Sequence, residues 1–136
     1  MPKVDFASVK APERRIETRT FSEPSLEGGE VTFTFSPMGL AEQMNVKEDQ
    51  DRLGKLISSP DDPVGNYLPA AGGRMARVSE SLFWLASNLA NMQAGPLYER
   101  YSAFDFLQML INCPDLSEEV VSWMWEVNGG KTDEGN

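Results

Sequence analysis

Residues able to do chemistry are scarce in this chain of 136 residues. It has no histidine and a single cysteine, Cys113, against 21 Asp and Glu and 12 Lys and Arg. No unperturbed side chain therefore titrates in the range that suits a proton shuttle, and Cys113 alone cannot assemble the Cys and His clusters that hold zinc. We expect no cofactor and no metal, and we expect that the protein is not an enzyme.

Carboxylates are the abundant reactive groups, and their spacing favours structural roles. Glu118 and Glu119 are neighbours, and adjacent residues on a helix do not face each other. The acids of segment 48–51 lack the spacing, the central glycine and the terminal glutamate of a calcium loop. Asp61 and Asp62 lie between two prolines, which is typical of a turn. None of these groups indicates a catalytic pair.

The charge is strongly acidic and unevenly distributed. The formal net charge is −9, and residues 101–136 carry seven acids and one base, a formal −6. Phosphate contact requires clustered Lys and Arg, so we expect no direct binding to nucleic acid. No apolar run approaches the ~20 residues that span a bilayer, and MPKVDFASVK at the start lacks the apolar stretch of a secretory signal. We expect a cytoplasmic protein that does not enter a membrane.

The N-terminal third predicts an arm followed by a hairpin. Residues 1–12 contain two prolines and little periodicity, which indicates an extended arm. In segment 14–36, two stretches alternate between apolar and polar residues, most clearly at Val31, Phe33 and Phe35, and a polar loop with two glycines separates them. The apolar face of this hairpin needs a cover, supplied either by helices or by a second copy of the chain.

The remainder predicts helices. Segment 74–93 is the clearest, because its apolar residues recur at steps of three and four, and we expect it to be the central core helix. The fold class is therefore α+β, an N-terminal β-hairpin followed by a helical bundle of about four helices, in a single domain over 13–128. The expected helices cover about 39–57, 74–93, 103–112 and 118–127. Residues 129–136 predict a disordered tail.

Two helix starts follow from capping patterns. Ser102, with Asp105 three residues later, predicts a capping box for helix 103–112. Ser117 predicts the N-cap of the last helix, because acids follow it in the first turn, where the helix dipole favours them. Residues 58–73 contain three prolines and three glycines and predict a long loop, one of the places to expect a partner.

A binding role needs side chains that the core does not use, and aromatic residues are the first candidates. Trp84 lies off the main apolar stripe of segment 74–93, so its indole packs under the long loop or forms a subunit contact. The residues that we expect to contact a protein partner are Phe33, Phe35, Tyr67, Leu68, Trp84, Trp123 and Trp125.

The order of these parts resembles a known family. A basic arm, a Phe/Thr-rich hairpin (RIETRTF…GGEVTFTFSPM) and a helical remainder with an acidic last helix and a short tail resemble the tail assembly chaperones of long-tailed bacteriophages. The resemblance implies a small, non-enzymatic protein of the host cytoplasm that coats the tape-measure protein and recruits tail-tube subunits. It also implies a longer form made by ribosomal frameshifting. Gly129-Gly130-Lys131 could be encoded by a slippery run, a G-then-A run of codons on which the ribosome changes reading frame.

The charge supports a second hypothesis of a different class. An acidic protein of this size could mimic nucleic acid and inhibit a host defence nuclease. In that role the carboxylates of Glu118, Glu119, Asp133 and Glu134 would carry the binding, whereas in a chaperone apolar side chains would carry it.

Overall fold

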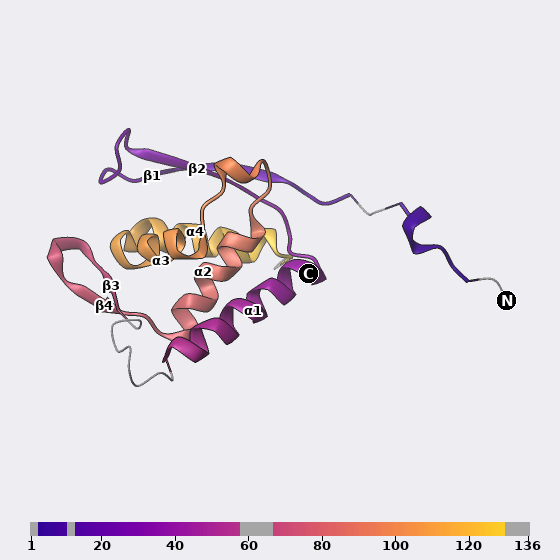
Figure 1. Cartoon of the computed structure of the whole chain (residues 1–136). Coiled ribbons are helices and arrows are strands. Elements are labelled where there is room, and N and C mark those ends of the chain that lie inside the picture. Colours follow the sequence, from indigo (N-terminus) through magenta and orange to yellow (C-terminus); the bar gives the residue numbers. More distant parts are fainter. Residues whose placement is uncertain (1–2, 11–12, 58–66, 130–136) are drawn as a thin grey trace.

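The computed structural model describes residues 3–10, 13–57 and 67–129. A β-hairpin comes first and four helices follow, as predicted for an α+β fold, with a small second sheet in addition (Figure 1). The strands are β1 (Glu17–Ser22), β2 (Glu30–Phe35), β3 (Tyr67–Pro69) and β4 (Met75–Arg77). The helices are α1 (Leu40–Ile57), α2 (Glu80–Met92), α3 (Ala103–Asn112) and α4 (Pro114–Val127).

The first hairpin has one polar face and one apolar face. In the antiparallel register of β1 and β2, Thr18 lies opposite Thr34 and Thr20 lies opposite Thr32. Their hydroxyls are hydrogen-bonded across the ladder at 2.9 Å and 2.7 Å. Because side chains alternate along a strand, the aromatic residues of the hairpin point to the opposite face. The aromatic side chains buried there are Phe21, Phe33 and Phe35.

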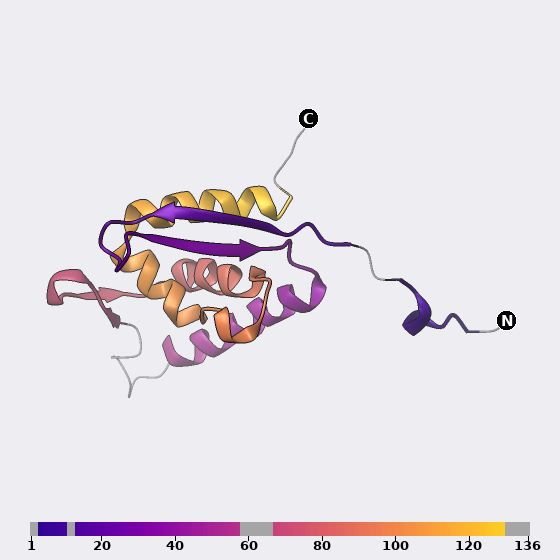
Figure 2. The same ribbon diagram turned by 90° about the horizontal axis from the view of Figure 1, so that it is seen from above.

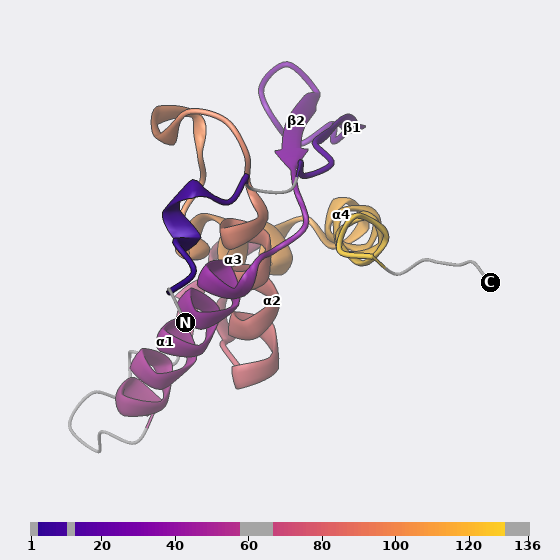
Figure 3. The same ribbon diagram turned by 90° about the vertical axis from the view of Figure 1, so that its right-hand side faces the viewer.

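Helices of the same chain cover the apolar face of the hairpin. Seen end-on, the hairpin forms a layer above α3 and α4 (Figure 3). The ring of Phe33 lies 5.5 Å from that of Phe106 on α3, and Phe35 stacks on Trp123 of α4 with a centroid distance of 4.7 Å. Figure 2, viewed from above, shows β1 running alongside α4. Of the two covers expected from the sequence, the intramolecular one is present.

Helix α2 is the central helix, as predicted, but it is shorter at its start than the predicted segment 74–93. It contacts α1, α3 and α4, and α1 packs on its side away from the hairpin (Figure 1). Its N-cap is Ser79, whose Oγ accepts a hydrogen bond from the backbone N–H of Leu82 at 3.1 Å. Residues 75–77 belong to β4, since Gly72 and Gly73, both at φ 76°, turn the chain back so that β4 pairs with β3.

Helix α4 also begins earlier than predicted. Its first residue is Pro114, which is tolerated there because the first N–H groups of a helix have no intrahelical partner. Ser117 is therefore not an N-cap. It is buried, and its Oγ donates a hydrogen bond to the carbonyl oxygen of Met109 on α3 at 3.0 Å. The capping box of Ser102 and Asp105 at the start of α3 is confirmed.

Arginines hold the start of β1 against the helices. Arg14 forms an ion pair with Glu42 of α1 at 2.8 Å. Nη2 of Arg15 donates to the backbone carbonyl oxygens of Glu126 and Val127, at 3.0 Å and 2.6 Å, at the end of α4. Before this anchor, residues 3–10 extend away from the domain, with a short 3₁₀ turn at Phe6–Ser8 (Figures 1 and 2).

Parts of three predictions fall outside the described residues. These are residues 1–2 and 11–12 of the predicted arm, residues 58–66 of the predicted loop and residues 130–136 of the predicted tail. The described remainder of the loop, from Tyr67 onward, forms the β3–β4 hairpin.

Candidate functional site

The structure divides the seven predicted contact residues into two groups. Phe33, Phe35 and Trp123 are exposed by 5% or less. In the structure these three side chains belong to the core, because the helices and the hairpin of one chain cover each other, and Phe33 also lines a surface hollow described below. The remaining residues retain surface, and their positions differ. Leu68 is half-buried against the core, whereas the exposed ones are Tyr67, Trp84 and Trp125.

Two tryptophans from different helices meet at the surface. The rings of Trp84 on α2 and Trp125 on α4 have centroids 5.7 Å apart and planes inclined by 33°. Their exposed fractions are 37% and 46%, so neither is a core residue. The sequence left two positions open for Trp84, under the long loop or at a subunit contact, and residues 58–66 of that loop lie outside the described residues. Among the described aromatic residues, the neighbour of Trp84 is Trp125. Tryptophan has a large apolar surface with a polar N–H, which suits it to protein interfaces.

Apolar side chains continue this surface along α4 and onto α3. Val121 lies one helical turn before Trp125 and is half-buried. A shallow hollow beside the indole is lined by Leu110, Pro114, Val121 and Trp125. We call these residues, together with Trp84, the tryptophan face. It is an apolar patch formed by three packed helices.

Two carboxylates lie beside the tryptophan face. Glu80 lies one turn before Trp84 on α2, and Glu118 lines the hollow beside Trp125. Helix α4 contains four acids and no Lys or Arg. The ion pairs between described residues involve none of the carboxylates of α2 or α4. The face therefore combines an apolar centre with a negative rim.

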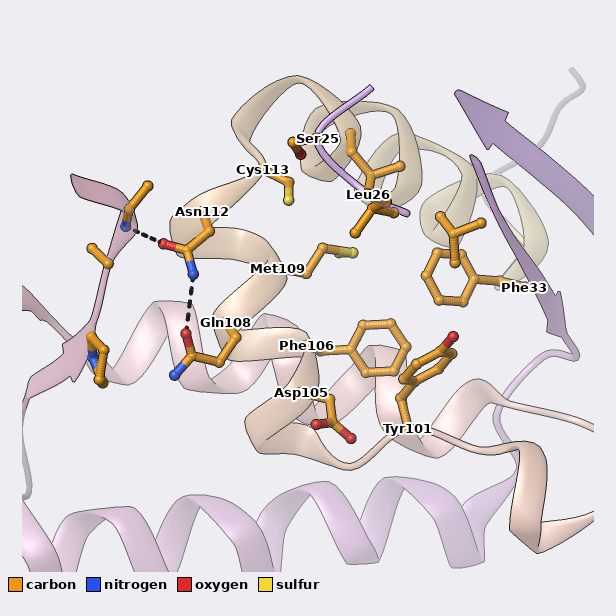
Figure 4. Close-up of a pocket in the computed structure, with 15 residues that line it drawn as sticks. Ser25, Leu26, Phe33, Tyr101, Asp105, Phe106, Gln108, Met109, Asn112 and Cys113 are labelled. Carbon is orange, nitrogen blue, oxygen red and sulfur yellow. Dashed lines mark hydrogen bonds between the residues drawn. The ribbon is translucent and has the colours of Figure 1, made fainter. Parts of the chain in front are cut away.

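A second hollow opens between the two hairpins, with a volume of about 610 Å³ (Figure 4). Helix α3 forms its floor, and its walls are the β1–β2 loop and the turn between β3 and β4. We call it the hairpin groove. Its apolar lining consists mainly of Leu26, Val31, Phe33, Phe106, Met109 and Leu116.

Asn112 fixes one wall of the hairpin groove. Its Oδ1 accepts a hydrogen bond from the backbone N–H of Ala71 at 2.7 Å, and its Nδ2 donates to Oε1 of Gln108 at 3.1 Å (Figure 4). The turn of the small hairpin is thereby attached to α3. Sequence reasoning missed this groove, since its lining comes from separate segments and one wall is a hairpin that was expected to be loop and helix.

The polar groups of the groove have structural partners. Asp105 accepts the backbone N–H of Ser102 at 2.8 Å as part of the capping box. Cys113 is a half-buried free thiol at the junction of α3 and α4. This arrangement is suited to holding apolar side chains.

The acids considered in the sequence are dispersed. Asp49 accepts hydrogen bonds from Arg52 and from Ser87 of α2, which links α1 to the central helix. Glu118 and Glu119 are exposed on α4, and Asp61 and Asp62 lie outside the described residues. Within the described part of the chain, no group of three or more His, Cys, Asp or Glu side chains is placed to hold a metal ion.

Among the helices of the described residues, none combines the length and the apolar character needed to cross a bilayer.

Comparisons with known proteins give no relative, since no protein-family model, curated protein or solved structure matches the chain.

Proposed function

We propose that the protein binds a helical segment of another protein on its tryptophan face, in the role of a phage tail assembly chaperone. Its partners in that role are the tape-measure and tail-tube proteins, and it acts in the host cytoplasm without catalysing a reaction. The observation that carries the proposal is the exposed contact between Trp84 and Trp125 within a rim of carboxylates.

The chemistry of the face specifies the partner. An amphipathic helix can lay apolar residues, spaced by three and four, across two neighbouring indoles. Lys and Arg at its flanks would then meet Glu80 and Glu118, whose charges no ion pair between described residues neutralises. Burying a tryptophan in the centre of an interface contributes about 2 kcal/mol or more to binding. Two adjacent indoles can therefore supply a large share of the affinity for such a helix.

The direct test is co-expression with the tape-measure protein encoded by the same genome. The wild type is expected to co-purify with it, and a variant with Trp84→Ala and Trp125→Ala is expected to lose at least about tenfold in affinity. Leu97→Ala is the matched control, because Leu97 is 79% exposed but lies outside the tryptophan face. The control should bind like the wild type.

Two results would remove the proposal. One is a failure of the wild-type protein to co-purify with the tape-measure protein, together with the absence of a slippery run in the coding DNA at Gly129-Gly130-Lys131. The other is an equal loss of binding in the double tryptophan variant and in the Leu97→Ala control, which would place the contact elsewhere.

The acidity of α4 favours one alternative, an inhibitor that mimics nucleic acid. Asp115, Glu118, Glu119 and Glu126 line a polar hollow between α4 and β1, and such carboxylates can occupy a basic site that normally binds phosphates. In that case, replacing Glu118 and Glu119 by Lys would abolish inhibition of a nuclease, and the double tryptophan variant would retain it. In a chaperone, the double tryptophan variant loses tape-measure binding, and the charge reversal at Glu118 and Glu119 weakens that binding less.

A further inference from the structure

The N-terminal arm holds apolar side chains out in water. Val4, Phe6 and Val9 are 67%, 81% and 60% exposed. The hydrogen bonds of this segment are local, since the Asp5 carboxylate accepts the backbone N–H of Ala7 and the Asp5 carbonyl accepts the hydroxyl of Ser8. In a 3₁₀ turn, side chains three residues apart lie on the same side. The turn therefore presents Phe6 and Val9 together, as a small preformed apolar surface.

The hairpin groove is an apolar site of suitable size for such a segment. Its volume of about 610 Å³ falls within the range of about 300–1,000 Å³ that holds compact ligands. The side chain of Met109 rises from its floor between Leu26 and Phe106 (Figure 4). The side chains of Phe6 and Val9 are apolar, as is most of this lining.

The arm of a chain leaves the domain far from the groove of that chain. Arg15 is tied to the backbone at the C-terminal end of α4, whereas Leu116 and Cys113 of the groove are at the N-terminal end of this helix. The helix has 14 residues and is about 21 Å long. The arm also points away from the groove (Figure 1). To reach its own groove it would have to reverse direction and cross the domain.

Charge favours contact between the arm and an acidic body, and the direction of the arm makes a second copy the accessible one (Figure 1). Residues 1–12 carry Lys3 and Lys10 against Asp5, a formal +1, which leaves −10 on the rest of a chain whose total is −9. Two acidic bodies repel each other, while the arm of one copy is attracted to the body of the other. We propose that residues 3–10 of one copy occupy the hairpin groove of a second copy, and that reciprocal exchange of arms forms a dimer.

The single native cysteine provides a sharp test, since Cys113 lines the groove. Ser8→Cys introduces a second thiol into the arm and leaves Phe6 and Val9 in place. Mild oxidation of this full-length variant is expected to give a covalent dimer in which a disulfide joins position 8 of one chain to Cys113 of the other, identified by peptide mass spectrometry. Adding Phe6→Ala should reduce the yield of this disulfide. The control Leu97→Cys should give no bond between positions 97 and 113.

Sedimentation velocity of the unoxidised protein measures the same association. The wild type is expected to dimerise with rising concentration, and Phe6→Ala is expected to weaken the dimer about tenfold, since buried aromatic anchors dominate small interfaces. The double variant of Trp84 and Trp125 should dimerise like the wild type, which separates this proposal from the proposed function. A monomer at all concentrations, or a disulfide between positions 8 and 113 within one chain of the Ser8→Cys variant, overturns arm exchange.

Discussion

Trp123 and Trp125 are two residues apart on α4 and have opposite roles. Trp123 is 1% exposed and lies between the hairpin and the helices, whereas Trp125 is 46% exposed and meets Trp84. A step of two residues rotates a side chain by about 200° around a helix. Residue type alone therefore does not separate a core aromatic from a contact aromatic. The angular position of the aromatic residue relative to the buried stripe of the helix does separate the two kinds.

The surroundings of Trp123 explain its importance for the fold. Its ring stacks on Phe35 at 4.7 Å and lies 5.6 Å from that of Phe21, so it joins both strands of the hairpin to α4. The guanidinium of Arg19 lies 5.2 Å from the centre of the ring, at a distance where a cation is attracted to an indole. No equivalent cluster surrounds the exposed pair among the described aromatic contacts, where Trp84 and Trp125 contact each other.

The largest expected effect is that of Trp123→Ala. Removing a buried tryptophan leaves a cavity between the hairpin and α4 and should lower the free energy of unfolding by about 3–5 kcal/mol. Urea denaturation followed by circular dichroism measures this change. A loss below about 1 kcal/mol, the scale of ordinary surface substitutions, would mean that the hairpin is not held by Trp123.

Replacing both exposed tryptophans should have a much smaller effect on stability. The pair contributes about 0.5–1.5 kcal/mol beyond its area burial, so Trp84→Ala with Trp125→Ala should shift the urea midpoint only modestly while weakening partner binding. The comparison with Trp123→Ala uses the same denaturation measurement. If the double variant and Trp123→Ala lower the free energy of unfolding by the same amount, the tryptophan face is part of the core and the two kinds of tryptophan do not differ in role.

Arg15→Ala tests how the end of α4 is held against the hairpin. The side chain donates to two terminal carbonyl oxygens of the helix, and hydrogen bonds from a charged group contribute about 1.5–3 kcal/mol when well shielded. Because the Arg15 side chain is 53% exposed, we expect a loss near about 1 kcal/mol. The matched control is Arg14→Ala, which removes one surface ion pair with Glu42 and should cost less. An equal effect of both changes would show that the carbonyl contacts contribute nothing.

The smallest effect is expected at Glu42 on α1. Hydrogen bonding from the backbone N–H of Gly39, at 2.6 Å, and from Arg14 lowers the pKa of the Glu42 carboxyl below its ordinary value. Its contribution to stability is thus present above the unfolded pKa of about 4.3 and is lost as the pH falls through the lower pKa of the folded state.

The measurement for Glu42 is the thermal midpoint as a function of pH. Glu42→Gln should flatten the acidic part of this profile slightly, and Glu48→Gln, an exposed position on α1, serves as the control. Identical profiles for Glu42→Gln and the wild type would exclude this contribution.

Local signals explain what was predictable of the fold. The alternation at Val31, Phe33 and Phe35 determines a strand and its buried face, and the capping box at Ser102 marks the first residue of α3. The start of α2 was missed because Met75 and Val78 have helical spacing, while pairing with β3 places Met75 in a strand. Such pairing is a tertiary effect that a local pattern does not contain.

The candidate sites were predictable only in part. Trp84 and Trp125 were selected for their residue type, but their contact depends on how α2 and α4 pack. The error at Ser117 has a similar origin, since its hydroxyl bonds to Met109 on another helix instead of capping its own. The hairpin groove depends on a hydrogen bond between Asn112 and the backbone of Ala71, for which the sequence contains no local signal.

The contact between the hairpin and Trp123 sets an order of events during synthesis. The ribosome makes Phe21, Phe33 and Phe35 early, but the indole that covers two of these rings is about 100 residues away along the chain. The nascent hairpin therefore emerges with its aromatic side uncovered, and Phe21 and Phe35 lack their indole partner until α4 has left the ribosomal exit tunnel. During that interval the growing chain can aggregate with other chains and can be bound by cellular chaperones.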